Sequence, residues 1–174
     1  MAVDLAAYIR DIRDYPKPGI VFKDVMPLFA VPEALHEAVD QLAAWAEPRR
    51  PDVILGAEAR GFVLGAALAY RMGIGFVAAR KPGKLPYTTI SAKYALEYGV
   101  DSLEVHIDAF PRGARVLVHD DLLATGGTAR AKCELVEQLG GVVVGAAFLI
   151  ELAFLEGRKR LEPYDVHALI RYDD

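Results

Sequence analysis

The amino-acid sequence predicts an α/β fold built on a mostly parallel, twisted sheet flanked by helices on both faces. Short apolar segments typical of buried strands alternate with longer segments in which apolar residues recur at helical spacing. Strands and helices that alternate in this way pack best as a parallel sheet between two helical layers. The 174 residues, of which 53% are hydrophobic, suit a single domain spanning 1–174 that buries its own core.

The first part of the chain is expected to contain two helices separated by an extended segment. Asp4 is a suitable N-cap for a helix over 4–12, because the apolar residues there share one face. Two prolines and a glycine within 15–19 end this helix, and 20–25 is expected to be extended. Pro32 fits the first turn of the second helix, which ends where two further prolines follow.

The remaining elements alternate as a parallel sheet requires. In chain order we expect strands at 52–55 and 75–79 on either side of a helix that ends at Met72, a loop over 85–92, two strands at 94–98 and 103–107 that pair, a strand at 115–118, a helix over 129–139, and strands at 142–150 and 166–170. Helices placed between successive strands provide the long crossovers that parallel strands need.

The composition argues against several classes of protein. A net charge of −4 and a pI of about 5.6 disfavour nucleic acid as the main partner. The single cysteine, Cys133, rules out a disulfide within the chain, and its place in a predicted helix favours a buried, unreactive thiol. The N-terminus lacks a basic region followed by an apolar core, and no apolar run reaches the length of a membrane span. We therefore expect no membrane partner and a cytoplasmic location.

The stretch 116–129 carries the most informative chemical pattern. An apolar strand ends in Asp120 and Asp121, whose carboxylates are suitable acceptors for a vicinal diol. The turn 125–128 then offers backbone N–H groups, two hydroxyls and the positive end of a helix dipole, which suits a phosphate. A diol site beside a phosphate site describes a phosphorylated ribose. The spacing matches neither a Walker loop nor a G-x-G-x-x-G dinucleotide turn, and an ordinary strand–turn–helix is the alternative.

A second turn of the same kind follows the predicted strand at 52–55. Its backbone N–H groups and the paired donors of Arg60 suit a pyrophosphate, although a tight turn with a solvent-exposed arginine fits the turn equally well in isolation. The presence of another phosphate-binding turn in the same predicted sheet favours the pyrophosphate site.

Arg80, Lys81 and Lys84 place three cations within five residues of an acidic protein. Such a run is usually a solvated face, but beside two phosphate-binding turns it favours a loop that neutralises a leaving polyanion. The polar segment that follows, to about residue 92, is long enough to form a mobile lid that excludes water.

Two titratable residues near these turns have alternative interpretations. Glu97 is either a solvent-facing residue of an edge strand or the group that handles a proton on a nucleobase nitrogen. His119 directly precedes the aspartate pair, and its place near a strand end favours a packed or carbonyl-bonded histidine over a general base. The other three histidines are scattered without ligand spacing, so we expect no metal site made by the protein itself.

Together these motifs resemble those of the adenine phosphoribosyltransferase family over nearly the full chain. The matching segments are 15–24, 56–62, 80–86, 94–99 and 116–129. The last segment alone is similar to phosphoribosyltransferases in general, which bind phosphoribosyl pyrophosphate (PRPP). Five motifs in this order are specific to the adenine branch.

The resemblance implies a fold, a reaction and an assembly. It implies the type I phosphoribosyltransferase fold with a small hood contributed by about 1–30, and it implies a homodimer. The implied reaction belongs to purine salvage: the phosphoribosyl group of PRPP is transferred to adenine, giving AMP and pyrophosphate. Mg²⁺ is expected to be bound with PRPP.

The resemblance also implies residue roles. Phe22 would stack on adenine, while the backbone of Val21 and Lys23 reads its amino edge. Glu97 is the implied catalytic acid or base. The remaining implied ligand-binding residues are Asp120 and Asp121 for the ribose hydroxyls; Ala124, Thr125, Gly126, Gly127 and Thr128 for the terminal phosphate; Ala57, Glu58, Ala59 and Arg60 for the pyrophosphate, with Arg60 also near the base; and Arg80, Lys81 and Lys84 in their own or a neighbouring active site.

The chain departs from the family pattern at three positions. His119 stands where an aliphatic residue is usual, Met26 where a small hydroxyl residue is common, and Ala78 where proline is common. His119 places a titratable group beside the ribose carboxylates, so the pH dependence is the property that this departure most affects.

Three other functions are compatible with parts of the pattern. A phosphoribosyltransferase for a 6-oxopurine such as hypoxanthine, guanine or xanthine needs a base pocket of opposite polarity, and the segment 21–23 favours adenine. A PRPP-sensing regulator would need a DNA-binding module or a basic face, which the acidic composition disfavours. A non-catalytic scaffold would not need all five ligand-facing motifs.

Overall fold

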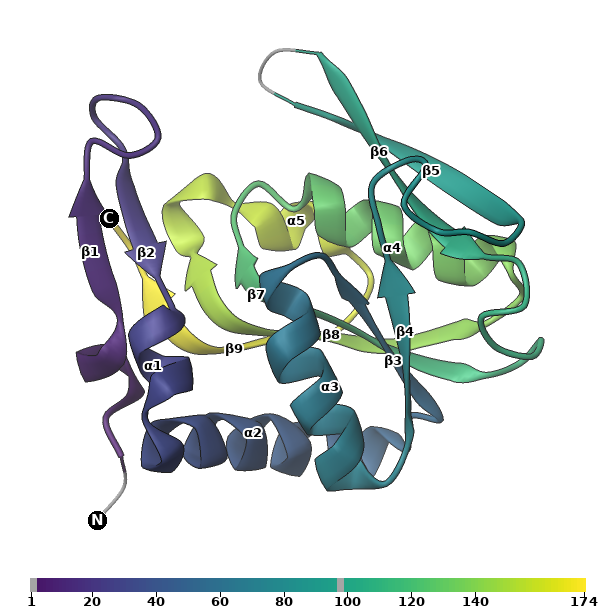
Figure 1. The fold of residues 1–174 in the computed structure, drawn as a ribbon, viewed down its shortest axis with the longest axis horizontal. Coiled ribbons are helices and arrows are strands. Elements are labelled where there is room, and N and C mark those ends of the chain that lie inside the picture. Colours follow the sequence, from purple (N-terminus) through teal and green to yellow (C-terminus); the bar gives the residue numbers. More distant parts are fainter. Residues whose placement is uncertain (1–2, 97–98) are drawn as a thin grey trace.

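A five-stranded parallel sheet forms the centre of the protein, with the strand order β4-β3-β7-β8-β9 (Figure 1). The computed structural model describes residues 3–96 and 99–174. The strands of this sheet are β3 (Val53–Ala57), β4 (Gly75–Ala79), β7 (Arg115–Leu123), β8 (Val142–Leu152) and β9 (Val166–Tyr172). Each neighbouring pair runs parallel, as the alternation of strands and helices predicts.

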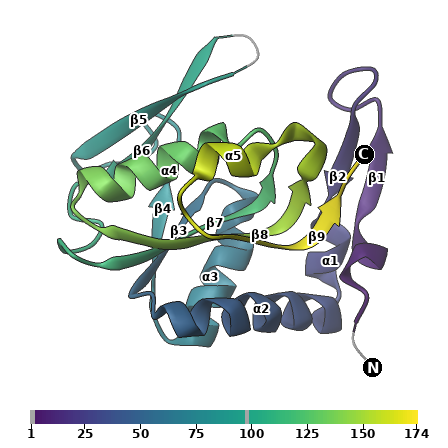
Figure 2. The same cartoon turned by 180° about the vertical axis from the view of Figure 1, so that it is seen from behind.

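Helices cover both faces of the sheet (Figures 1 and 2). One face carries α2 (Pro32–Ala46) and α3 (Arg60–Met72), and the other carries α4 (Gly127–Gln138) and the short α5 (Gly157–Leu161). On α3, Leu64 and Leu68 are fully buried because they are one helical turn apart on the face that meets the sheet. Burying each such leucine stabilises the fold by roughly 1.5–3 kcal/mol. The α/β fold class expected from the sequence is therefore confirmed.

Two antiparallel hairpins stand beside the sheet, and the strands of both extend past the edge at which β4 ends (Figure 1). The first pairs β1 (Arg10–Arg13) with β2 (Val21–Asp24), and the second pairs β5 (Thr89–Ala95) with β6 (Val100–His106). A 3₁₀ turn, η1 (Leu5–Tyr8), precedes the first hairpin. Helix α1 (Met26–Ala30) follows that hairpin, and the remaining short turns are η2 (Glu47–Arg49) and η3 (Ala153–Leu155).

The expected helix over 4–12 is wrong beyond Tyr8. Asp4 does cap the first turn, since its carboxylate accepts the Ala6 N–H at 3.1 Å. From Arg10 onward the chain instead forms β1, in which Ile12 pairs with Phe22. A helix of so few residues is unstable by itself, so long-range strand pairing decides the structure of this segment.

The expected loop over 85–92 is also wrong in its second half. Strand β5 begins at Thr89, earlier than the predicted 94–98, and its register with β6 places Thr89 opposite His106. Conversely, the predicted strand at 75–79 and the predicted helix end at Met72 are confirmed. Within the described part of the chain, none of the helices combines the length and the apolar character needed to cross a membrane.

Candidate active site

A cavity of about 240 Å³ opens at the carboxyl ends of β3 and β7. The predicted site residues that line it are Ala57, Glu58, Arg60, Lys81, Asp120, Asp121, Ala124, Thr125, Gly126, Gly127 and Thr128. Tyr94 and Leu103 of the second hairpin also line the cavity, as do Leu122, Leu123 and Ala129, and none of these five was a predicted site residue. The structure thus brings the two predicted turns and the aspartate pair together at the sheet edge where open α/β folds bind ligands.

The turn that leads into α4 has the geometry of an anion site. Gly126 has a φ of +86°, a conformation that side chains rarely adopt, and α4 begins at the next residue. A Cβ on Gly126 would lie 2.5 Å from the Gly157 carbonyl oxygen, so space also requires glycine. The first N–H groups of a helix have no intrahelical acceptor and are free to bind an anion in the cavity. We call residues 124–128 the phosphate loop, after the ligand that the sequence predicts for them.

Asp120 is held in place from three sides. Its Oδ2 accepts a hydrogen bond from Lys132 Nζ at 2.7 Å, and its Oδ1 accepts the backbone N–H of Asp121 at 3.0 Å. A Cβ on Gly61 would lie 2.6 Å from Oδ1, so only glycine leaves room for the carboxylate. Asp120 is therefore fixed in one orientation before any ligand binds.

Lys132 is a charged residue of the site that the sequence did not predict. It lies on α4, is completely buried, and also donates to the His119 carbonyl oxygen at 2.7 Å. The available signal was a lysine at a position flanked on the same helix by buried Ala129, Cys133 and Val136. Because lysine is almost never fully buried without a partner, that position implies a buried carboxylate opposite it.

Asp121 faces the other side of the site. Its Oδ2 lies 3.0 Å from Arg60 Nε, and its side chain is 6% exposed. Burial, followed by repulsion from Asp120, raises the pKa of Asp121 to about 7, while the charge of Arg60 opposes the shift. The Arg60 guanidinium lies 5.0 Å from the centre of the Phe22 ring. Arg60 thus connects the aspartate pair to the first hairpin.

His119 is a buried structural histidine, as expected. It is fully buried, and its Nδ1 forms a 2.9 Å hydrogen bond with the Ala147 carbonyl oxygen. Burial lowers the pKa of His119 to about 4, so the imidazole is neutral at pH 7. Cys133 is also buried, and burial raises the pKa of its thiol to about 12, which agrees with the expected unreactive thiol.

The basic segment after β4 divides into three different environments. The Arg80 guanidinium pairs with Glu58, which also accepts the Lys81 backbone N–H at 2.6 Å. Burial alone would raise the pKa of Glu58, but these hydrogen bonds hold it below its usual value. Lys81 Nζ pairs with Asp101 and donates to Tyr94 Oη at 2.8 Å, which places it in the cavity wall.

Lys84 and the predicted adenine-binding residue Lys23 lie outside the cavity lining. Lys84 donates its backbone N–H to the Lys81 carbonyl oxygen at 3.3 Å, closing the turn that contains Gly83. Lys23 pairs with Asp11 at 2.7 Å and lies 4.0 Å over the Tyr172 ring.

The predicted adenine-binding residues of the first hairpin do not line the cavity, and the predicted catalytic residue cannot be placed. Val21 and Phe22 belong to β2, which pairs only with β1 in the described residues. The other backbone edge of β2 has no strand partner there and is suited to hydrogen bonding with a base. Ala59 immediately precedes α3, and Glu97 lies outside the described residues.

Comparison with known proteins shows the family of this chain. The phosphoribosyl transferase domain model matches residues 31–170. An adenine phosphoribosyltransferase from Rubrobacter xylanophilus is 63% identical over 167 residues, covering 95% of this chain and 90% of that protein. The crystal structure of the adenine phosphoribosyltransferase from Thermoanaerobacter pseudethanolicus matches with a TM-score of 0.95 and 53% identity, covering 97% of this chain and 98% of that chain.

The structure of the Saccharomyces cerevisiae adenine phosphoribosyltransferase, complexed with an imino-altritol bisphosphate and adenine, matches with a TM-score of 0.92 and 39% identity, covering 95% of this chain and 96% of that chain. The type I phosphoribosyltransferase fold expected from the sequence is confirmed by these matches. At this identity and coverage, the chain belongs to the phosphoribosyltransferase family and, within it, to the adenine phosphoribosyltransferases.

Proposed function

We propose that this enzyme acts in purine salvage by transferring the phosphoribosyl group of PRPP to adenine, giving AMP and pyrophosphate. The observation that carries the proposal is the meeting, in one cavity, of a fixed carboxylate pair and a glycine-rich helix N-terminus. These are the partners that the diol and the terminal phosphate of PRPP require. The relatives described above bear the name of this activity.

In this proposal, three groups of residues bind three different parts of PRPP. Asp120 and Asp121 accept hydrogen bonds from the ribose hydroxyls, and the phosphate loop binds the terminal phosphate. Lys81 and the turn at 57–60 face the pyrophosphate. In the transition state, positive charge develops on the ribose ring while negative charge moves to the pyrophosphate, so carboxylates near the sugar and cations near the leaving group stabilise both.

Magnesium is expected to arrive with PRPP rather than to reside in the protein. Among the described residues, His, Cys, Asp and Glu side chains do not gather in groups of three that could hold a metal ion. The two aspartates of the site are paired with Lys132 and Arg60, which suits ribose binding. Magnesium on the pyrophosphate supplies charge neutralisation of the leaving group.

We assign the specificity for the base to the first hairpin of the predicted hood. Adenine donates hydrogen bonds from its exocyclic amine, and a strand edge such as that of β2 offers backbone carbonyl acceptors at fixed spacing. Phe22, which the Arg60 guanidinium approaches to 5.0 Å, provides an aromatic surface for the ring. A 6-oxopurine presents a carbonyl where adenine presents an amine, so it would leave the acceptors of such a pocket unpaired.

A base panel tests the proposed function directly. The purified protein is incubated with PRPP, magnesium and, separately, adenine, hypoxanthine, guanine or xanthine, and the nucleotide products are separated. We expect AMP from adenine and no nucleotide above background from the three 6-oxopurines. A nucleotide from a 6-oxopurine at a comparable rate would assign the chain to the other base class, and no product from any base would refute the proposal.

Glu97 is proposed as the group that handles the proton on the base. Replacing it with glutamine keeps the size of the side chain but removes its basicity, so Glu97→Gln should lower kcat by roughly 10²-fold or more. The dissociation constant for PRPP should change little, because PRPP binds through the other residues. Steady-state kinetics and calorimetric titration of PRPP measure the two quantities. A weakened PRPP affinity with an unchanged kcat would reassign Glu97 to ligand binding.

The pH dependence of PRPP binding should follow Asp121. Its pKa is raised to about 7, so the carboxylate gains a proton as the pH falls through neutrality and can no longer accept two hydroxyl hydrogen bonds. The ratio of PRPP affinities of the wild type and Asp121→Asn should therefore approach 1 near pH 5.5 and increase with pH until about pH 8. Taking the ratio cancels the titration of PRPP itself.

A matched histidine variant separates the two titratable candidates. His119→Val should leave the PRPP affinity ratio to wild type constant across this pH range, because the pKa of His119 is already lowered to about 4. A His119→Val ratio that changes between pH 5.5 and 8 would show that His119, and not Asp121 alone, controls the pH dependence. The expected homodimer and the expected cytoplasmic location stay predictions.

A further inference from the structure

The phosphate loop is supported from outside the cavity by a segment far away in the sequence. Gly157, the first residue of α5, lies against it so closely that a Cβ on Gly157 would be 2.4 Å from the Ala124 carbonyl oxygen and 3.1 Å from the Gly126 nitrogen. In the opposite direction, a Cβ on Gly126 would be 2.5 Å from the Gly157 carbonyl oxygen. The two backbones are in direct contact, so a shift of Gly157 would move the phosphate loop with it.

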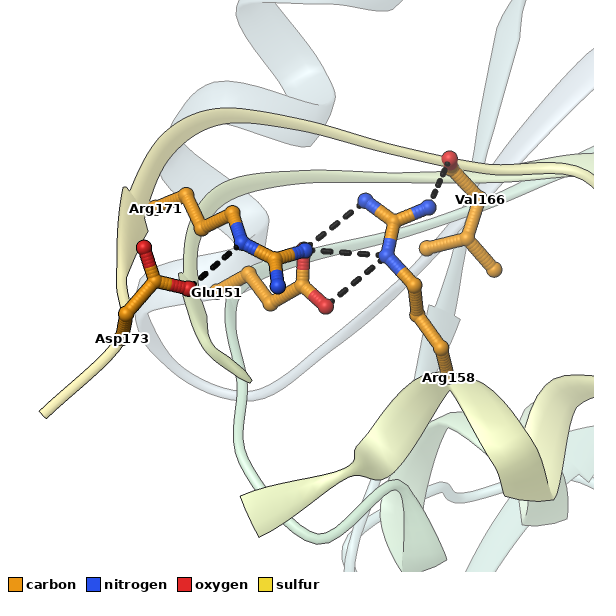
Figure 3. Close-up of polar contacts among 5 residues, drawn as sticks. All are labelled: Glu151, Arg158, Val166, Arg171 and Asp173. Atoms are coloured by element: carbon orange, nitrogen blue, oxygen red, sulfur yellow. Dashed lines mark hydrogen bonds and ion pairs between the residues drawn. The ribbon is translucent and has the colours of Figure 1, made fainter. Parts of the chain in front are cut away.

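Arg158, the neighbour of Gly157, anchors α5 to the sheet through its side chain, in addition to the buried Leu161 of the same helix. Figure 3 shows the Arg158 side chain reaching from α5 to Glu151 and to the backbone of Val166. Nε lies 2.8 Å from Glu151 Oε1, Nη2 lies 2.8 Å from Oε2, and Nη1 donates to the Val166 carbonyl oxygen at 2.6 Å. One guanidinium therefore connects α5 to the end of β8 and the start of β9.

Glu151 is suited to act as the fixed point of this connection. It is near the end of β8 and its side chain is 3% exposed, whereas Arg158 is 42% exposed. Arg171 also approaches the carboxylate, but at 3.8 Å, and its own closer partner is Asp173 at 2.9 Å (Figure 3). The paired, two-point contact with Arg158 is the stronger and more directional one.

We propose that Glu151 and Arg158 are positioning residues for the phosphate loop. Their ion pair holds α5 so that Gly157 supports the phosphate loop and keeps the N–H groups of residues 124–128 aimed at the terminal phosphate of the substrate. The inference rests on the proposed function, since it assigns the anion bound by this loop to the 5′-phosphate of PRPP or AMP. Neither residue lines the cavity, so the effect is transmitted through the Gly157–Gly126 contact.

The test uses the double variant Glu151→Gln/Arg158→Met. Removing Arg158 alone would leave a buried carboxylate without its main partner, which destabilises the protein, whereas replacing both charges avoids this cost. The binding of AMP and of adenosine is measured by calorimetry, because the ratio of their affinities reports the contact with the 5′-phosphate. The ratio of the AMP affinity to the adenosine affinity should be about tenfold lower in the double variant than in the wild type, because a small displacement of a binding loop weakens its contact with the ligand.

The same measurement distinguishes positioning from a general effect on folding. The adenosine affinity, and the kcat at saturating PRPP, should remain within about threefold of wild type, while the KM for PRPP should increase about tenfold. A general loss of structure would weaken AMP and adenosine alike. The control variant Arg71→Met removes an exposed ion pair with Asp40 at 2.7 Å, on the opposite helical layer, and should leave the AMP-to-adenosine affinity ratio unchanged.

A second variant tests the contact itself. Gly157→Ala introduces a Cβ against the Ala124 carbonyl oxygen while keeping both charges of the ion pair, and it should also lower the AMP-to-adenosine affinity ratio. An unchanged affinity ratio in the double variant would overturn the inference, and an unchanged ratio in Gly157→Ala would overturn the proposed transmission through the Gly157–Gly126 contact. A wild-type protein that makes AMP from adenine would still support the proposed function in that case, so the two failures are distinguishable.

Discussion

The double substitution Asp120→Asn/Asp121→Asn is expected to nearly abolish turnover with PRPP. Asparagine keeps the shape of both side chains but removes the charges that strengthen their hydrogen bonds to the ribose hydroxyls. Hydrogen bonds to charged groups contribute about 1.5–3 kcal/mol each, so the loss of two should lower kcat/KM for PRPP by roughly 10²- to 10⁴-fold. Steady-state kinetics at several PRPP concentrations measures this loss.

Two controls assign this loss to the ribose contact. Circular dichroism and thermal unfolding establish that the variant is folded at the assay temperature, since Asp120 also neutralises Lys132. The affinity for adenine alone should stay near that of wild type, because these carboxylates do not contact the base in our proposal. A kcat/KM for PRPP within about threefold of wild type would refute the ribose role of the pair.

The second large effect is on stability and concerns the pair Lys132–Asp120. Lys132 is fully buried, whereas Asp120 is 15% exposed, so an unpaired Lys132 costs more than an unpaired Asp120. We therefore expect Asp120→Asn to lower the free energy of unfolding by about 3–5 kcal/mol and Lys132→Met to lower it by less. The combined variant should recover most of the stability, because no buried charge is then left unpaired. Urea unfolding of the three variants measures the order.

An exposed lysine provides the matched comparison. Lys159 pairs with Glu156 at 2.6 Å, but both side chains are more than 60% exposed. Lys159→Met should therefore change the stability by less than about 0.5 kcal/mol. If the combined variant were less stable than Asp120→Asn alone, the two residues would not form the coupled pair that the structure indicates.

The sequence predicts those parts of the fold that depend on local pattern. The strand at 75–79 and the end of α3 were predicted correctly because apolar runs and turn residues mark them directly. In the first hairpin, the extended segment at 20–25 was predicted correctly and corresponds to β2, but β1 was not predicted. Ile12 carries the helical spacing of its neighbours, and only its pairing with Phe22, ten residues further on, makes it part of a strand. Local patterns contain no information about such a partner.

The site follows the same division. The aspartate pair and the glycine turn lie in one short stretch of sequence, so the predicted diol and phosphate sites can be inferred from that stretch alone. The residues that fix them come from elsewhere: Lys132 from the following helix, Arg60 from the start of α3, and Gly157 from α5. Arg60 is already a predicted site residue, but the contacts of Lys132 with Asp120 and of Gly157 with the phosphate loop are visible only in the three-dimensional structure.

The most direct test of the account is a crystal structure of the protein with PRPP and magnesium. We expect the ribose hydroxyls within hydrogen-bond distance of Asp120 and Asp121, and the terminal phosphate enclosed by the backbone N–H groups of residues 124–128. Density for PRPP in any other part of the molecule, with this cavity empty, would contradict it.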